Sequence, residues 1–254
     1  RARSVLHTYL DREARVITPA IATKLYLDLV ESLNDKTGKP LAAATHRFYL
    51  KLARAVFAWA LRKGYVQQNP FLNVQAVGRV NVGKPQLRID EAQRFVNTAL
   101  ARFDDQADPM AMAALIALLM GLRASEVLQR RVRDVDRNGE ILWIDGGKSK
   151  NARRYLDVPA VLQPRLMQLC SGREPDEFLM GISANGEPKR RQALWTTVHR
   201  LCLAAQVHPV CPHSLRGLWA TLGVQSGAVS HAVAASLGHG SFSMTAKHYA
   251  QPEA

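Results

Sequence analysis

Residues 79–87 divide the sequence into two parts that differ in length and in charge. This stretch contains Gly83 and Pro85 and few large apolar side chains, a composition typical of a linker. Residues 1–80 hold 13 Lys and Arg against 5 Asp and Glu, whereas residues 81–254 hold 21 against 16, so the shorter part carries most of the positive charge. We therefore expect two domains, at 1–78 and 88–254, joined by a linker at 79–87.

Apolar residues recur at helical spacing through most of both parts. The clearest case is 41–63, where apolar residues between Leu50 and Ala60 lie three or four positions apart. Residues 140–145 and 155–158 are instead rich in strand formers and flank a turn. Further helices are expected at 21–33, 90–101, 109–119, 161–170, 190–205, 214–225 and 228–237. These patterns indicate mostly helices with a few strands, and they permit a mainly α protein with a small sheet.

The formal charge of +13 at pH 7 is large for a chain of 254 residues. Such a surplus is typical of proteins that bind a polyanion, usually nucleic acid. A small, strongly basic helical domain is in turn typical of a DNA clamp. The alternative is a protein that is merely basic, whose charges form solvated helix faces.

Other features bear on location and on cofactors. The sequence has no run of about 18 apolar residues that predicts a membrane span, and no signal peptide. Its three cysteines, Cys170, Cys202 and Cys211, have neither the number nor the spacing of a disulfide framework or a zinc site. We expect a cytoplasmic protein without metal or cofactor and, because the sequence begins at Arg1 rather than Met, a fragment of a longer protein.

Short polar segments follow one another in the C-terminal part. They are Gly121-Leu122-Arg123-Ala124-Ser125-Glu126, the turn Lys148-Ser149-Lys150-Asn151, His213-Ser214-Leu215-Arg216, Leu237-Gly238-His239 and, ten residues later, Tyr249. In this order, GLRxSE, HxLR, LGH and a tyrosine near the C-terminus resemble the tyrosine recombinases of the phage integrase type. The resemblance covers 87–254 with distinctive motifs. It covers 1–80 more loosely, through the helical pattern and the ending Gly64…Asn69-Pro70. The resemblance implies a mainly α architecture, with a small helical, SAM-like core-binding domain followed by a mixed α+β catalytic domain that contains a small antiparallel sheet.

The chemistry of a phosphodiester explains the residue types. Its negative charge repels nucleophiles, so attack requires cations at the nonbridging oxygens. Arg123 and Arg216 suit this task because a guanidinium stays charged and its planar fork matches two phosphate oxygens. Tyr249 is the predicted nucleophile, and a phenol with an ordinary pKa of about 10 needs cationic neighbours or a base before it attacks.

The resemblance assigns roles to the remaining motif residues. His239 becomes a further hydrogen-bond donor to the phosphate. His213, three residues before Arg216, either bonds the phosphate or helps to deprotonate the tyrosine. The leaving 5′ oxygen needs a proton, and a lysine of the turn is the predicted general acid. Lys150 is preferred, with Lys148 as the alternative.

Supporting positions complete the predicted site. Glu126, three residues after Arg123, is expected to share its helix face and to orient a catalytic basic side chain. Because the arginines supply positive charge, no metal ion and no ATP are expected. Contacts to DNA are expected from Arg47, Lys51 and Arg54 on the basic face of 41–63 and from Lys148 and Arg153 at the turn.

The resemblance implies a site-specific recombinase or integrase, and the alternatives for its host are a phage, a mobile island or a chromosome-dimer resolution system. It cleaves and rejoins double-stranded DNA through a 3′-phosphotyrosyl intermediate in a prokaryotic cytoplasm. Four protomers on two DNA sites are expected during recombination, and a monomer in free solution.

Two features depart from the family pattern. The gap from His239 to Tyr249 is ten residues where nine is usual, and only five residues follow the tyrosine. The short end either puts the mode of oligomerisation in doubt or reflects truncation of the sequence. The alternatives are a type IB topoisomerase-like enzyme, a DNA-binding relative without activity and, with less support, a transcription factor without a catalytic centre.

Overall fold

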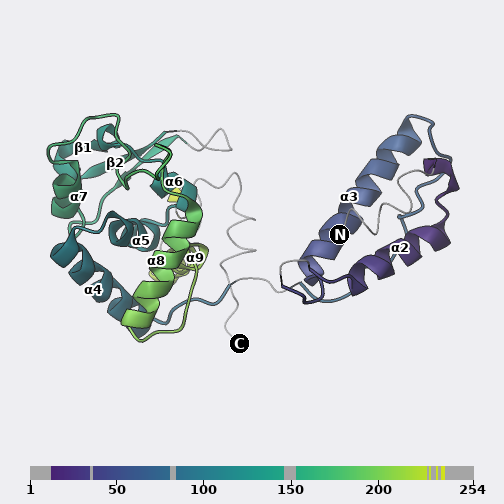
Figure 1. The fold of residues 1–254 in the computed structure, drawn as a ribbon, viewed down its shortest axis with the longest axis horizontal. Helices are drawn as coiled ribbons and strands as arrows, with labels where there is room; N and C mark the ends of the chain where they lie inside the picture. The colour runs from purple at the N-terminus through teal and green to yellow at the C-terminus, as the bar shows by residue number, and fades with distance from the viewer. Residues whose placement is uncertain are drawn as a thin grey trace. The chain divides into compact units, whose positions relative to one another are not determined.

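The computed structural model describes residues 13–34, 37–80, 84–145 and 153–227, together with Val229, Val233, Ser236 and Leu237. Backbone contacts divide the chain into two compact units, Arg1–Asn81 and Val82–Ala254, and both are drawn in Figure 1. The boundary falls inside the 79–87 segment that the sequence indicates as a linker. The roles of the two units as DNA clamp and catalytic domain stay predictions.

The N-terminal unit is built from two packed helices. They are α2 (Pro19–Glu31) and α3 (Ala43–Arg62), preceded by the short 3-10 turn η1 (Ala14–Val16). Thr18 caps the start of α2, because its side chain accepts a hydrogen bond from the backbone N–H of Ile21. Ala22, Leu25 and Tyr26 of α2 and Leu50 of α3 form a small apolar core with Phe71 and Val74.

Two arginines of α3 hold the chain that follows this helix. The side chain of Arg54 donates to the carbonyl of Phe71 at 3.1 Å and to that of Val74 at 2.5 Å. The side chain of Arg47 donates to the carbonyl of Gly78 at 2.7 Å. Both side chains therefore stabilise the unit itself, and their predicted contacts to DNA stay predictions.

The C-terminal unit is mainly helical around one buried helix. Its helices are α4 (Ile89–Gln106), α5 (Pro109–Leu119), α6 (Ala124–Leu128), α7 (Gln163–Cys170), α8 (Arg191–Ala204) and α9 (Pro212–Gln225), with 3-10 turns η2 (Val132–Asp134) and η3 (Arg137–Gly139). Helix α5 is apolar all round, so it is buried among α4, α8 and α9 (Figure 1). Asp108 caps its start by accepting from the backbone N–H of Met110 at 2.9 Å.

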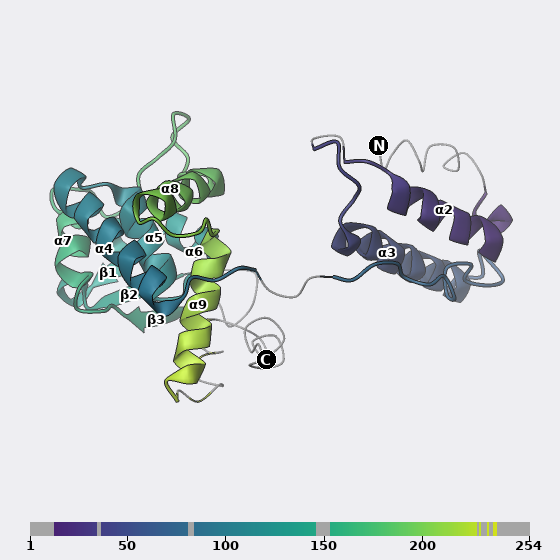
Figure 2. The same ribbon diagram turned by 90° about the horizontal axis from the view of Figure 1, so that it is seen from below.

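A small antiparallel sheet lies beside α7 (Figure 2). Its strands are β1 (Val135–Asp136), β2 (Ile141–Ile144) and β3 (Arg154–Asp157), in the order β1-β2-β3. In this register Ile144 pairs with Arg154, the first residue of β3. A mainly α fold with a small antiparallel sheet is therefore confirmed. The predicted helix at 228–237 lies largely outside the described residues.

Among the helices that the structure describes, none is both long and apolar enough to cross a bilayer.

Candidate active site

The GLR segment makes a sharp turn directly before α6. Gly121 has a φ of +65°, a backbone conformation that side chains with a Cβ rarely adopt. Arg123 follows in an extended conformation as the residue that precedes α6. The expectation that Arg123 and Glu126 share a helix face is therefore wrong, because Arg123 lies just outside the helix.

Arg123 and Glu126 are nevertheless joined by two hydrogen bonds. The backbone N–H of Arg123 donates to Oε2 of Glu126 at 2.9 Å, and Nη1 of Arg123 donates to Oε1 at 2.8 Å. One carboxylate thus satisfies the start of α6 and fixes the guanidinium of Arg123. Contact through a helix cap replaces the predicted contact along a helix face.

Arg216 of α9 is almost completely buried, with 1% of its surface exposed. Its Nη1 donates to the carbonyl of Gly121 at 2.5 Å, and its Nη2 donates to the carbonyl of Leu237 at 2.8 Å. Nη1 also lies 3.7 Å from Oε2 of Glu126. The buried guanidinium therefore joins three segments that are far apart in the sequence.

Glu126 is the common partner of three arginines. Besides Arg123 and Arg216, Arg154 of β3 places its Nη2 3.2 Å from Oε2 of Glu126. Burial is the largest influence on the pKa of Glu126 and raises it. The backbone N–H of Arg123 and the guanidinium groups of Arg154 and Arg123 outweigh burial, so the pKa lies below its ordinary value. The carboxylate is therefore the charged centre of a cationic cluster.

A pocket of about 440 Å³ opens beside this cluster. It brings together Arg123, His213 and Arg216, three of the six residues that the motifs predict to be catalytic. Helices α6, α8 and α9, which carry or adjoin much of its lining, are drawn in Figure 1. The lining residues are Lys84, Arg123, Ala124, Ser125, Arg191, Gln192, Trp195, Cys211, Pro212, His213 and Arg216.

The lining is strongly cationic. Lys84, Arg123, Arg191 and Arg216 all contribute, and none of these described lining residues is acidic. Such a surface attracts an anion, and guanidinium donors on it match phosphate oxygens. His213 is exposed whereas Arg216 is buried, so α9 contributes one exposed and one buried side chain to the pocket.

Sequence reasoning missed several residues of this pocket and cluster. Lys84 lies in the predicted linker, and Arg191 and Trp195 lie in a helix that carries none of the motifs. The Arg190-Arg191 pair at the start of α8 was the available signal. Nothing in the sequence near Arg154 distinguishes it from Arg153, because only folding brings it to Glu126.

Cys211 precedes α9 and lines the same pocket. Its Sγ lies 3.4 Å from Oγ of Ser214. Burial, the largest influence, raises the pKa of the thiol. Hydrogen bonds from Ser214 and from the backbone N–H of His213, with the charge of Lys84, outweigh burial and hold the pKa below its ordinary value. This behaviour is that of a thiol at the start of a helix in a cationic setting.

Other predicted residues are placed elsewhere or not described. Lys148, Lys150, His239 and Tyr249 lie outside the described residues. Arg153 is largely exposed and pairs with Asp145 at 3.0 Å. Lys51 is exposed on α3 of the N-terminal unit.

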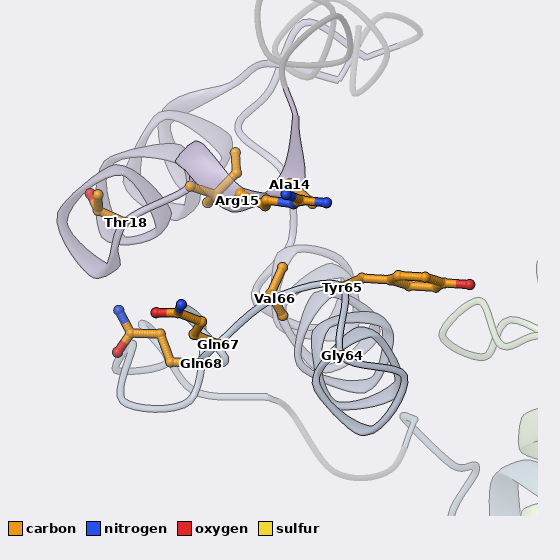
Figure 3. Close-up of a pocket in the computed structure, with 9 residues that line it drawn as sticks. Ala14, Arg15, Thr18, Gly64, Tyr65, Val66, Gln67 and Gln68 are labelled. Carbon is orange, nitrogen blue, oxygen red and sulfur yellow. The ribbon is translucent and has the colours of Figure 1, made fainter.

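A second pocket of about 440 Å³ lies in the N-terminal unit. In Figure 3, Arg15 and Thr18 lie on one side of it and the amide side chains of Gln67 and Gln68 on the other, while Tyr65 points away. These side chains can donate and accept hydrogen bonds, but they offer no nucleophile with an adjacent base. The pocket beside Glu126 is therefore the candidate active site.

Comparisons with known proteins agree with the motifs. The Phage integrase family matches residues 85–254. A tyrosine recombinase XerD of Ralstonia nicotianae is 29% identical over 207 residues, which cover 74% of this chain and 63% of that protein. A tyrosine recombinase XerD of Pseudomonas putida is 28% identical over 246 residues, covering 92% of this chain and 79% of the relative. The chain thus spans less than two thirds of the length of the Ralstonia relative.

Solved structures share the fold. The Tn1549 transposon integrase in complex with a circular intermediate DNA has a TM-score of 0.78 at 17% identity, covering 99% of this chain and 88% of that one. A lambda integrase dimer bound to a COC′ core site has a TM-score of 0.71 at 15% identity, covering 100% and 71%. With the match over residues 85–254 of 254, the chain belongs to the phage integrase family.

Proposed function

We propose that this chain is a site-specific DNA recombinase that cleaves and rejoins DNA through a 3′-phosphotyrosyl intermediate. The observation that carries the proposal is the cationic pocket that Arg123, His213 and Arg216 line together. The family's relatives that bear the name tyrosine recombinase support the same activity.

The pocket suits a phosphate because its donors are fixed before the substrate arrives. Glu126 holds the guanidinium of Arg123, and backbone carbonyls of Gly121 and Leu237 hold that of Arg216. Fixed donors aimed at developing charge need no reorganisation during the reaction. Removal of one such donor typically costs on the order of 100- to 1000-fold in rate.

The chemical step follows from these groups and from residues that stay predictions. The Tyr249 oxygen attacks the scissile phosphorus, and the bond from phosphorus to the 5′ oxygen breaks. The tyrosine proton passes to a base, for which His213 is the candidate. The 5′ oxygen takes a proton from Lys150, or from Lys148. His239 adds a donor to the phosphate. A 5′ hydroxyl from a partner duplex then reverses the step, so the covalent link conserves the bond energy.

The substrate is double-stranded DNA, and the basic N-terminal unit supports a second contact to it. Lys51 is exposed there, and residues 1–80 carry a net charge of +8 from 13 Lys and Arg against 5 Asp and Glu. Four protomers on two DNA sites carry out the exchange. The described cysteines, Cys170, Cys202 and Cys211, are free thiols, which supports a cytoplasmic location.

Covalent trapping tests the proposal. Duplexes selected from a randomised pool by binding to the wild-type chain are rebuilt with a nick near the cleaved position, so that the released fragment diffuses away. The wild-type chain is expected to remain attached to DNA on a denaturing gel. Tyr249→Phe is expected to bind the same duplexes and to trap none.

Each other outcome rejects part of the proposal. Trapping by Tyr249→Phe places the nucleophile on another residue. Tight binding without trapping by the wild-type chain leaves a DNA-binding protein without activity. Efficient relaxation of a supercoiled plasmid that lacks the selected sequence indicates a topoisomerase.

A further inference from the structure

Arg154 joins three separate segments of the C-terminal unit although none of the motifs includes it. It is the first residue of β3, and its side chain is 11% exposed. Its Nε donates to the carbonyl of Ser236 at 2.8 Å. Its Nη2 and Nη1 lie 3.2 and 3.5 Å from Oε2 and Oε1 of Glu126. The guanidinium therefore ties the sheet to α6 and to the chain after α9.

Arg154 and Arg216 together hold two consecutive carbonyls. Arg154 bonds the carbonyl of Ser236, and Arg216 bonds that of Leu237. Both guanidinium groups also lie within 4 Å of Glu126. One carboxylate and two arginines thus fix the backbone immediately before Gly238-His239, the motif with the predicted histidine.

The position of Arg154 relative to the pocket separates it from the other two arginines. Arg123 and Arg216 line the pocket, whereas Arg154 does not appear among its lining residues. A buried ion pair is a weak source of stability compared with a well-packed apolar residue, so its benefit often lies in specifying geometry. The contacts of Arg154 therefore indicate a residue that acts on the phosphate through its neighbours.

We propose that Arg154 is a positioning residue for DNA cleavage. It sets the carboxylate of Glu126 and the backbone at 236–237, which hold Arg123 and Arg216, so that these two guanidinium groups meet the same phosphate. This inference rests on the proposed recombinase activity. A competing role is support of the lysine turn, since β3 begins directly after residues 146–152. The described contacts favour the first role because they run to Glu126 and Ser236.

Two variants of Arg154 and one control test the proposal. Arg154→Gln removes the charge, and Arg154→Lys keeps it but loses the planar fork. Arg173→Gln is the matched control. Arg173, like Arg154, pairs with a glutamate and bonds backbone carbonyls. Its partners are Glu177 and the carbonyls of Leu169, Phe178 and Leu179, rather than Glu126 and Ser236.

The measurement is the single-turnover rate of covalent trapping on the nicked duplexes, with enzyme in excess, beside the Kd for the same DNA. A misplacement of about 1 Å in a catalytic site costs on the order of 100-fold in rate. We expect a loss of about that size for Arg154→Gln, a smaller loss for Arg154→Lys and none for Arg173→Gln. The Kd is expected to change by less than about threefold, because Arg154 does not line the pocket.

A substrate with sulfur in place of the 5′ bridging oxygen separates the two roles. A thiolate leaves without a proton because the pKa of a thiol, about 8.5, lies far below that of an alcohol. If Arg154 positions the phosphate-binding groups, Arg154→Gln cleaves both substrates with the same relative loss. If Arg154→Gln instead cleaves the sulfur substrate at the wild-type rate, Arg154 supports the general acid, and the proposal is overturned.

The remaining outcomes are also distinguishable. Wild-type trapping together with an undiminished rate for Arg154→Gln overturns the role of Arg154 alone. Failure of the wild-type chain to trap overturns the recombinase activity instead. If thermal melting shows that Arg154→Gln does not fold, Arg154→Lys decides the matter, with a loss of about tenfold expected on both substrates and a wild-type rate contradicting the proposal.

Discussion

Gly121→Ala tests whether the GLR turn is held by close packing as well as by backbone conformation. Gly121 has a φ of +65°, and its carbonyl accepts a hydrogen bond from Arg216. A Cβ added there would lie 2.7 Å from Cε3 and 2.8 Å from Cδ2 of Trp219, and 3.2 Å from Cδ2 of Leu237. Both Trp219 atoms belong to the indole ring, which cannot bend away as the end of a flexible side chain does.

Two costs add in this variant. Left-handed backbone costs an alanine about 1–2 kcal/mol. An extra carbon in a packed interior costs about 1–3 kcal/mol more. The expected loss is therefore about 2–5 kcal/mol, a large share of the roughly 5–15 kcal/mol that stabilises a typical domain. At about 2–4 °C per kcal/mol for a unit of this size, the melting temperature falls by about 4–20 °C.

Gly172→Ala supplies the matched control. Gly172 has a φ of +68°, and a Cβ added there meets no atom within 4 Å. The free energy of unfolding of Gly172→Ala should fall only by the backbone contribution of about 1–2 kcal/mol. The assay is urea unfolding of the full chain, followed by near-ultraviolet circular dichroism of the tryptophans. Equal losses in the two variants would refute the steric argument, since they would show that Trp219 moves aside at little cost.

Two further predictions concern charge and pH. Glu126→Gln removes the common partner of the buried Arg216, the largely buried Arg154 and the half-buried Arg123. The free energy of unfolding in urea should fall by about 3–5 kcal/mol. Because the arginine partners hold the pKa of Glu126 below its ordinary 4.5, the wild type should lose stability as the pH falls below about 4.5, and the variant should lose less. Burial lowers the pKa of His46 below 6.5, so the N-terminal unit should lose stability as the pH falls below about 6.5, and His46→Gln should flatten this dependence. Unfolding of that unit is followed by the fluorescence of Trp59, its tryptophan. A wild-type unfolding transition that does not depend on pH would contradict the role of His46.

Most of the helices and strands could be predicted because their signals are local. Pro109 is a helix start signal that predicts a helix over 109–119, and the structure has α5 at Pro109–Leu119. The segment 140–145 contains β2 (Ile141–Ile144) because it is rich in strand formers and is followed by a turn signal, Gly146-Gly147. Strand β1 has two residues, too few for any periodicity, so only its pairing with Leu142 and Ile141 defines it.

The candidate site was only partly predictable for a related physical reason. Motif residues Arg123, His213 and Arg216 carry a pattern that the resemblance makes visible, and the pocket brings them together. Lys84 and Arg154 reach the site through folding of segments that have no such pattern. A long arginine or lysine side chain can come from almost any exposed position, so sequence spacing does not identify its target.

The placement of charge explains how this site stays folded without a substrate and still favours a phosphate. Glu126 lies behind the pocket, within 4 Å of the guanidinium groups of Arg123, Arg154 and Arg216. Without that carboxylate, the buried Arg216 and the largely buried Arg154 would repel each other and the half-buried Arg123 across a medium that screens poorly. A carboxylate in the lining itself would repel the phosphate that the lining must attract. One anion on the inner side cancels only part of the positive charge, and the remainder is compensated by an anion that enters from solvent. Under the proposed function, a DNA phosphate is the anion that completes this charge balance. The same residues would then serve both stability and cleavage.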